Sequence, residues 1–286
     1  MSRSDIRALL ARYGLRAHRD RGQNFLVAED WAEKLVALSG VTTDESVLEI
    51  GTGLGILTCA LAQRVRRVVS IEIDAGLVRL LRTERVLPEN VELLHADALA
   101  VDLAALCNSM PSPVSAVANL PYAVSAPLLR RLLDLRGRLR SWSVMVQREV
   151  GKRLVAGPGS RDYGSLSVLY QLSARVEERA ELHAGYFFPA PQVSSVFLCV
   201  QPRLDVPLAD RELVVLERLL RAAFGHRRKT LRNALRAAET FTDVEHSVLE
   251  SAWTLLGVDP GVRPETLAPE IYRALARQLA EVSTFG

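Results

Sequence analysis

The sequence predicts an α/β fold with a mostly parallel sheet, followed by a small α-helical domain. Short apolar segments alternate with helical patterns over about 100 residues, which is typical of a sheet covered by helices on both faces. A glycine-rich turn directly follows the first apolar segment. Beyond residues 201–207, which contain two prolines and resemble a domain linker, the remaining pattern is helical.

The elements follow one another in a regular order. We expect strands at 46–50, 67–73, 91–94, 114–118 and 142–147, helices at 57–63, 75–82 and 125–133, and a later strand at 193–200. The C-terminal helices are expected at 211–224, 228–238, 244–255 and 268–282. The predicted domains are therefore 1–203, which includes a basic N-terminal arm, and 204–286.

Composition limits the class of protein. Of the 286 residues, 49% are hydrophobic and 24% are charged, as in a soluble globular protein. The sequence shows neither a run of about 18 apolar residues nor a secretory signal, so we expect no membrane association. Cys59, Cys107 and Cys199 lie far apart, which predicts reduced thiols in the cytoplasm and no metal site.

Basic residues are concentrated in two segments. Seven lie between Arg218 and Ala238 without an intervening acid: Arg218, Arg221, Arg227, Arg228, Lys229, Arg232 and Arg236. The first 21 residues hold six arginines against two aspartates. Both segments fit a polyanionic partner, although a solvated helix face explains either one equally well.

The turn after the first strand has the pattern of a nucleoside-binding loop. Gly51, Gly53 and Gly55 form G-x-G-x-G, whereas dehydrogenases use G-x-G-x-x-G to hold a pyrophosphate. Glu72 ends the second strand, where a carboxylate can accept hydrogen bonds from both hydroxyls of a ribose. Asp97 follows the third strand and can accept from an adenine amine. Each acid alone is also compatible with a surface carboxylate or a helix cap.

The tetrapeptide Asn119-Leu120-Pro121-Tyr122 follows the fourth strand and predicts chemistry on an adenine amine. That amine is a poor nucleophile, because its lone pair is delocalised into the ring. The side-chain oxygen of Asn119 can accept one amine hydrogen, and the carbonyl of Leu120 or Pro121 the other. Pro121 fixes the carbonyl direction, and Tyr122 offers a ring on which an extruded base can stack.

On these motifs the sequence resembles the KsgA/Dim family of small-subunit rRNA adenine N6-dimethyltransferases. The resemblance extends over nearly the whole chain: Gly22-Gln23-Asn24-Phe25-Leu26 is similar to the family's GQNFL, residues 187–193 to its F-x-P-x-P-x-V, and residues 224–233 to its F-x-x-R-R-K-T-x-R-N. It implies a Rossmann-like class I S-adenosylmethionine-dependent methyltransferase domain with a helical rRNA-binding domain.

The resemblance also implies roles for individual residues. The residues expected to bind S-adenosylmethionine are Asn24, Leu26, Gly51, Glu72, Asp97 and Asn119. Those expected to act on the target base are Asn119, Leu120, Pro121, Tyr122 and Phe187. Those expected to contact RNA phosphates are Arg227, Arg228, Lys229 and Arg232. Phe187 is expected to pack on the face of the base opposite Tyr122, although ordinary core packing also explains it. The implied substrate is a pair of adjacent adenosines in a 3′-terminal hairpin loop of 16S rRNA, methylated by a monomer on the 30S precursor.

The sequence departs from the family pattern at two positions. Thr52 stands where the family usually has Pro, and Ala123 where it usually has Asn after the catalytic Tyr. The second departure affects the predicted target pocket. We expect activity to persist, because every group assigned to the amine precedes Ala123.

Three other functions remain as alternatives. An Erm-type enzyme dimethylates an adenine of 23S rRNA and confers macrolide resistance with the same fold and mechanism; Leu120 and the R-R-K-T segment argue against it. A ribosome-assembly factor with secondary methyltransferase activity would keep the cofactor residues. A nicotinamide-dependent dehydrogenase would leave Asn-Leu-Pro-Tyr unexplained.

Overall fold

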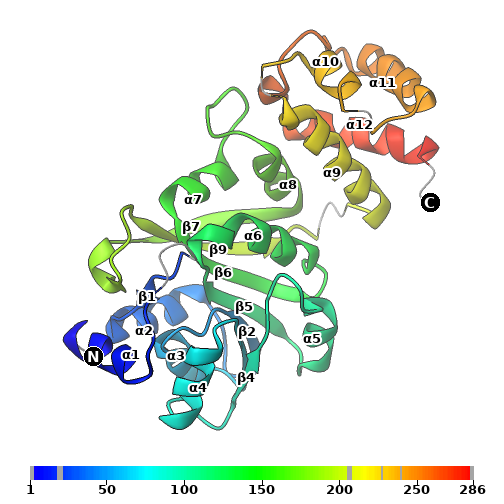
Figure 1. Ribbon diagram of the computed structural model, residues 1–286. Helices are drawn as coiled ribbons and strands as arrows, with labels where there is room; N and C mark the ends of the chain where they lie inside the picture. Colours follow the sequence, from blue (N-terminus) through cyan, green and yellow to red (C-terminus); the bar gives the residue numbers. More distant parts are fainter. Residues whose placement is uncertain (1–2, 18–21, 205–207, 227, 239, 284–286) are drawn as a thin grey trace. The chain divides into compact units, whose positions relative to one another are not determined.

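The computed structural model describes residues 3–17, 22–204, 208–226, 228–238 and 240–283 (Figure 1). The chain divides into two compact units. The sheet unit comprises Met1–Gly151 and Val176–Pro202, and the helical unit comprises Lys152–Arg175 and Arg203–Gly286. The division is therefore discontinuous, unlike the single boundary after residue 203 expected from the sequence. Residues 152–175 leave the sheet unit and group with the C-terminal helices.

The sheet unit is built on seven strands in the order β4-β3-β2-β5-β6-β9-β7. Their bounds are β2 (Ser46–Ile50), β3 (Arg67–Glu72), β4 (Val91–His95), β5 (Val114–Asn119), β6 (Leu139–Gln147), β7 (Ala174–Leu182) and β9 (Ser195–Pro202). The β4-β3, β3-β2, β2-β5 and β5-β6 pairs are parallel, and β9 pairs antiparallel with β6. The predicted fold class is thus confirmed, with the five expected strands side by side.

Helices cover both faces of this sheet. They are α2 (Glu29–Ser39), α3 (Ile56–Arg64), α4 (Ala75–Thr83), α5 (Leu103–Ser109) and α6 (Ser125–Asp134). The sheet unit also contains the short 3-10 turns η2 (Tyr122–Val124) and η3 (Ala184–Tyr186), and α7 (Arg148–Val155) begins in it and ends in the helical unit. Right-handed crossovers place α3 and α4 on one face, and α5 and α6 on the other (Figure 1). The strand order reverses between β2 and β5, so a ligand site is expected at their carboxyl ends.

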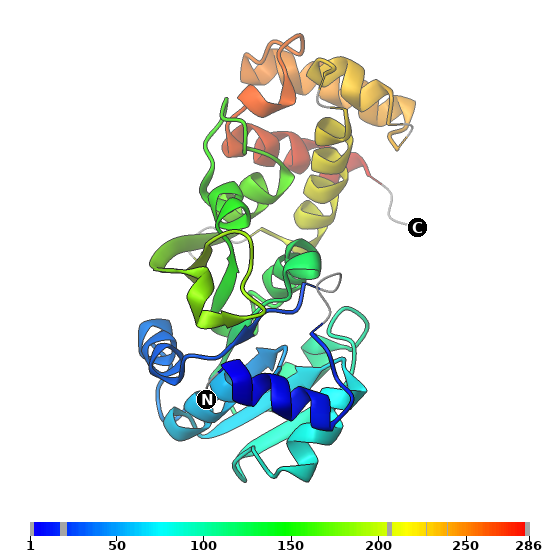
Figure 2. The same cartoon turned by 60° about the vertical axis from the view of Figure 1, so that its left-hand side comes forward.

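The basic N-terminal arm contains a helix, α1 (Arg3–Arg12), which is not among the helices expected from the sequence. Ile6 and Leu10 lie one turn apart and are buried in a cluster that includes Leu77 and Leu81 of α4. Arg7 and Arg12 of this helix are exposed. Figure 2 shows α1 in dark blue, lying across this part of the sheet unit. The sequence analysis did not predict this helix because charged residues outnumber Ile6 and Leu10 and obscure their helical spacing.

A second, two-stranded sheet joins the start of the chain to a late segment. β1 (Phe25–Leu26) pairs antiparallel with β8 (Phe187–Phe188), so that Leu26 faces Phe187 and Phe25 faces Phe188. This pairing carries the predicted GQNFL motif to the edge of the site described below.

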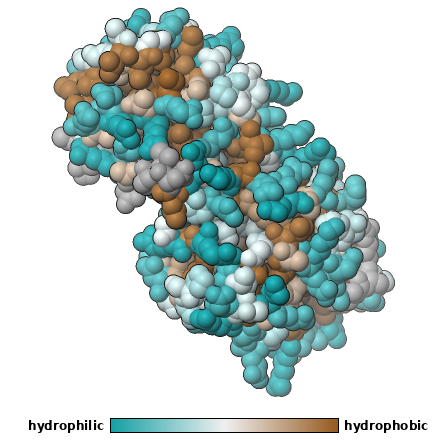
Figure 3. Space-filling model, turned by 180° about the vertical axis from the view of Figure 1, so that it is seen from behind, coloured by the Kyte–Doolittle hydropathy of each residue, from teal (hydrophilic) through white to brown (hydrophobic). Residues whose placement is uncertain are grey.

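The helical unit contains α8 (Ser165–Ser173), α9 (Asp210–Gly225), α10 (Leu231–Arg236), α11 (Asp243–Leu256), η4 (Pro264–Thr266) and α12 (Pro269–Val282). Tyr272 is fully buried among them, and its hydroxyl donates to the carbonyl of Pro264 at 2.7 Å. Exposed apolar side chains include Val244 and Leu255, and Figure 3 shows apolar surface on this unit at the upper left. Its surface is therefore not uniformly charged.

The described residues contain neither a candidate membrane span nor a candidate metal site. None of their helices combines the length and apolar character needed to cross a bilayer. None of their histidines, cysteines, aspartates and glutamates gather in a group of three that could hold a metal ion.

Candidate active site

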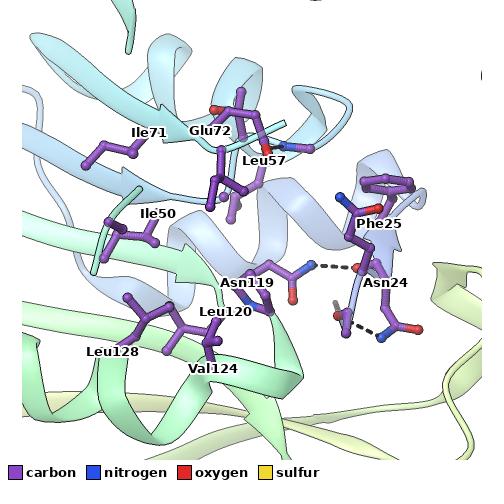
Figure 4. A pocket seen from close by; sticks show the side chains of 18 of the residues that line it. Asn24, Phe25, Ile50, Leu57, Ile71, Glu72, Asn119, Leu120, Val124 and Leu128 are labelled. Atoms are coloured by element: carbon purple, nitrogen blue, oxygen red, sulfur yellow. Dashed lines mark hydrogen bonds between the residues drawn. The ribbon is translucent and has the colours of Figure 1, made fainter. Parts of the chain in front are cut away.

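A cavity of about 610 Å³ lies in the sheet unit, next to the carboxyl ends of β2, β3, β4 and β5 (Figure 4). It is within the size range of ligand sites, roughly 300–1,000 Å³. Eight residues selected from the sequence line it: Asn24, Leu26, Gly51, Glu72, Asp97, Asn119, Leu120 and Pro121. Segments that are far apart in the sequence thus converge where the strand order reverses. Tyr122 and Phe187 are not part of this lining among the described residues.

The glycine loop brings backbone against the cavity. Gly51, Gly53 and Gly55 have φ values of 88°, 59° and 82°, in the left-handed region that favours glycine. A Cβ atom on Gly53 would lie 3.1 Å from the ring of Phe25, and one on Gly51 would lie 3.5 Å from the backbone oxygen of Asn119. The loop therefore lies between the N-terminal segment and the tetrapeptide Asn119–Tyr122, with little space for side chains.

Glu72 is held in a fixed orientation at the end of β3. Its Oε2 accepts from the backbone N–H of Gly53 at 2.9 Å, and its Oε1 accepts from that of Asp74 at 2.9 Å. Burial raises the pKa of the carboxyl, while the N–H donors of Asp74 and Gly53 oppose that shift. Each oxygen keeps a further acceptor position, so the group can still receive two hydroxyls of a ligand.

Another part of the cavity lining combines an acid with exposed aliphatic side chains. Asp97 is exposed, and its Oδ1 accepts from the N–H of Leu99 at 2.8 Å. Ile73 and Leu99 also line the cavity, although they remain 52% and 37% exposed. Exposed aliphatic side chains beside a carboxylate suit a flat ring that carries an amine.

A buried acid supports the glycine loop, and the sequence analysis assigned it no role. Glu49 is fully buried on β2, and its Oε2 accepts from the hydroxyls of Thr58 and Ser70, each at 2.6 Å. The Ser70 hydroxyl also lies 2.6 Å from that of Thr52 in the loop. Burial raises the pKa of Glu49 to about 8, although the two hydroxyls lower it. In the sequence, this role was indicated only by the position of Glu49, an acid between the apolar residues Leu48 and Ile50 of a buried strand.

Asn119 has one partnered and one unpartnered end. Its Nδ2 donates to the backbone oxygen of Asn24 at 2.9 Å, whereas Oδ1 is buried and has no hydrogen-bond partner among the described residues (Figure 4). A buried acceptor without a donor is costly, on the order of 1–3 kcal/mol. The site therefore holds a preformed acceptor that a ligand N–H can satisfy.

The tetrapeptide is fixed from both sides. The N–H of Leu120 donates to the carbonyl of Met145 at 3.2 Å, and the N–H of Tyr122 donates to that of Gly22 at 3.3 Å. Gly22 has φ +66°, and a Cβ atom there would lie 2.5 Å from the backbone nitrogen of Ala123. Only glycine fits this contact. Gly22 is thus a second residue that the sequence analysis left without a role, and its partner Ala123 is the position that departs from the family pattern.

The two aromatic residues assigned to the target base differ in their surroundings. Tyr122 is half-buried, and its hydroxyl is hydrogen-bonded to that of Ser195 on β9. Phe187 is fully buried in the core cluster that contains Leu26 and Phe197. In this structure Phe187 is a core residue, so its stacking on a base stays a prediction.

The predicted RNA-binding cations fall into two groups within the helical unit. Arg228 and Lys229 are exposed and form no ion pair with any described residue, whereas Arg227 lies outside the described residues. Arg232 instead pairs with Glu250 at 3.0 Å, and its guanidinium lies 5.5 Å over the ring of Trp253. Of the four residues assigned to RNA binding, Arg228 and Lys229 therefore have side chains available to contact a phosphate.

Comparison with known proteins identifies the family. Residues 14–252 match the family described as ribosomal RNA adenine dimethylase. The chain is 42% identical over 283 residues to the ribosomal RNA small subunit methyltransferase A of Anaeromyxobacter dehalogenans (strain 2CP-C), covering 96% of this chain and 97% of that relative. The protein of the same name from Geobacillus thermodenitrificans (strain NG80-2) is 36% identical over 274 residues, covering 95% and 94%.

Two solved structures have the same fold. A dimethyladenosine transferase from Plasmodium falciparum aligns with a TM-score of 0.69 at 23% identity, covering 88% of this chain and 95% of that one. The 23S rRNA methyltransferase ErmE aligns with a TM-score of 0.63 at 24% identity, covering 90% and 99%. With the family match over residues 14–252 and relatives spanning nearly its full length, the chain belongs to the ribosomal RNA adenine dimethylase family.

Proposed function

We propose that this protein dimethylates the exocyclic N6 amine of two adjacent adenosines in a 3′-terminal hairpin loop of small-subunit rRNA, with S-adenosylmethionine as the methyl donor. The full-length relatives named ribosomal RNA small subunit methyltransferase A support this substrate. This methylation is a step of small-subunit biogenesis in the cytoplasm. The protein acts as a monomer, and its substrate is the 30S precursor.

The cavity fits a nucleoside-containing methyl donor. Glu72 has acceptor positions left for two ribose hydroxyls, and Asp97 with the aliphatic side chains of Ile73 and Leu99 suits an adenine ring. The glycine loop allows close backbone approach, and Asn24 and Leu26 close the cavity from the N-terminal side. When bound, S-adenosylmethionine supplies an electrophilic methyl group on a sulfonium.

The observation that carries the proposal is the unpartnered Oδ1 of Asn119. It accepts one N6 hydrogen of the target adenine, and the carbonyl of Leu120 or Pro121 accepts the other. These contacts turn the nitrogen lone pair out of the ring plane, toward the electrophile. Transfer of the methyl group to N6 would leave the donor as a neutral thioether, S-adenosylhomocysteine, and the N6 proton would pass to solvent. Tyr122, held by Ser195, supplies the surface on which the extruded base stacks.

Cations of the helical unit contribute to RNA affinity. Arg228 and Lys229 neutralise backbone phosphates and position the enzyme without reading sequence, and Arg227 shares this role. The target lies in a loop because unstacked bases cost less to extract.

The deciding experiment is methyl transfer from labelled cofactor to small subunits that lack the modification, with large subunits in parallel. Primer extension then maps the labelled bases. We expect label in two adjacent adenines near the 3′ end of the small-subunit rRNA. Label confined to the large subunit would replace this proposal with the Erm-type reaction.

A further inference from the structure

The arginines of the N-terminal segment have no role in the function proposed above. α1 packs on the sheet unit through Ile6 and Leu10, which are 0% and 3% exposed, and this leaves Arg7 and Arg16 on the surface. A cleft of about 540 Å³ lies between this segment and the turn after β8. Its lining includes Arg7, Leu10, Leu15, Arg16, Phe188 and Pro189. We call it the N-terminal cleft.

The N-terminal cleft combines positive charge with an aromatic ring. The guanidinium of Arg7 lies 5.6 Å from the centroid of Phe188. No acidic residue lines the cleft among the described residues, and neither Arg7 nor Arg16 forms an ion pair there. Arg12, on the same helix, is different because it pairs with Glu84 at 2.6 Å. The cleft therefore keeps its charge available for an anion.

The N-terminal cleft adjoins the catalytic cavity. Phe188 pairs in register with Phe25, and Phe25 lines that cavity. The same ribbon of β1 and β8 thus borders both hollows. When the target base of an RNA strand enters the cavity, the flanking nucleotides must contact the surface next to it. The N-terminal cleft lies at that surface and is lined by arginines.

We infer that the N-terminal cleft binds the single-stranded nucleotide next to the target adenosine. Its base stacks on the pair formed by Arg7 and Phe188, and Arg7 and Arg16 contact the flanking phosphates. Aromatic rings and guanidinium planes are the surfaces on which unstacked RNA bases are held. Arginine also binds phosphate through paired N–H donors. The inference rests on the proposed function, because it requires an RNA loop as substrate.

The test compares Arg7→Gln, Arg16→Gln and their double variant with Arg12→Gln, which removes the same charge from the same helix outside the cleft. RNA binding is measured on a hairpin that contains the target loop, over a range of salt concentrations. We expect the double variant to bind about tenfold more weakly and to lose about 1.5 from the salt slope, at about 0.7–0.9 for each phosphate contact. The affinity for S-adenosylmethionine should stay at the wild-type value, and Arg12→Gln should bind RNA within about twofold of wild type.

A second readout tests the stacking itself. A 2-aminopurine placed beside the target adenosine should be quenched on binding, and Phe188→Leu should remove that quenching. Wild-type affinity and slope in the double variant would overturn the inference. Weakened binding to assembled subunits with unchanged binding to the hairpin would also overturn it, since the cleft would then contact a ribosomal protein.

The same data separate this inference from the proposed function. Methylation of small subunits by the wild type, with no effect of the arginine variants, removes only the inference. A wild-type protein that neither binds the hairpin nor methylates either subunit removes both.

Discussion

The carboxamide nitrogen of Asn119 donates to the backbone oxygen of Asn24 at 2.9 Å, and this contact determines which end of the carboxamide remains available. A carbonyl can only accept, so the NH2 end must face Asn24 and the oxygen must face away from it. The orientation of the acceptor proposed to meet the adenine amine is therefore set by a residue 95 positions earlier in the sequence.

We expect Asn119→Ala to lower kcat for methyl transfer by about 100-fold or more, the scale seen when one preorganised hydrogen-bonding group is removed from an active site. The affinity for RNA should change by less than about twofold, because the substitution alters none of the cations proposed to contact phosphates. Single-turnover transfer and RNA titration measure the two effects. Turnover at the wild-type rate would refute the orienting role of Asn119.

Gly22→Ala tests the contact between the N-terminal segment and the tetrapeptide. The new Cβ atom would lie 2.5 Å from the nitrogen of Ala123, so the loop must move and kcat should fall at least tenfold. Gly257→Ala is the matched control, since Gly257 has φ +63° and nothing lies within 4 Å of its Cβ position. Both variants should lose about 1 kcal/mol of stability from the left-handed backbone. Equal kcat in the two variants would show that the contact has no catalytic effect.

Glu49→Gln should change how stability depends on pH. Burial raises the pKa of Glu49 from the ordinary value of 4.5 to about 8, so the folded protein keeps a proton that the unfolded chain releases. Stability from this group is complete below pH 4.5 and is lost as the pH rises toward about 8, by about 1.4 kcal/mol for each pH unit. Glutamine is neutral throughout and lacks this loss.

Urea unfolding between pH 5 and about pH 8 should therefore show the Gln variant gaining stability relative to the wild type as the pH rises. Glu178→Gln, at an exposed position on β7, serves as the control and should give a constant difference. A constant difference for Glu49→Gln as well would mean that the acid is ionised in the folded protein.

The free and paired cations of the helical unit should behave differently. Replacing Arg228 and Lys229 with Gln should reduce the salt slope of RNA binding by about 1.5, because two phosphate contacts are lost. Replacing Arg232 and Arg236 with Gln is the control with the same charge change. Both of these residues pair with Glu250, at 3.0 and 3.3 Å, so we expect a much smaller effect on the slope. Equal slopes for the two double variants would contradict this division.

The part of the fold that follows from local pattern was predictable from the sequence. Alternating apolar and helical segments predicted the parallel strands, and that prediction is confirmed. Gly51, Glu72, Asp97 and Asn119 lie at or just after the ends of four of these strands, and they line one cavity because the carboxyl ends of parallel strands meet at one edge. Their roles toward a ligand stay predictions.

The features that were missed depend on partners distant in the sequence. Arg218 belongs to the basic segment that fitted either a polyanionic partner or a solvated helix face, but it pairs with Glu245, which is 27 residues away and almost fully buried. The return of residues 152–175 to the helical unit depends on contacts such as that of the Tyr163 hydroxyl with the carbonyl of Leu267. No periodicity within either segment reports such contacts.

The pairing of β1 with β8 also has a consequence for synthesis of the chain. Asn24, which orients Asn119, is adjacent to a strand whose partner Phe188 is translated only after β6, α7 and the whole excursion into the helical unit. When the glycine loop and the tetrapeptide of a nascent chain have been translated, the two-stranded sheet of β1 and β8 that positions them has therefore not yet formed. Competence for catalysis arrives late on the ribosome, when the segment around β8 has emerged and closed onto the beginning of the chain.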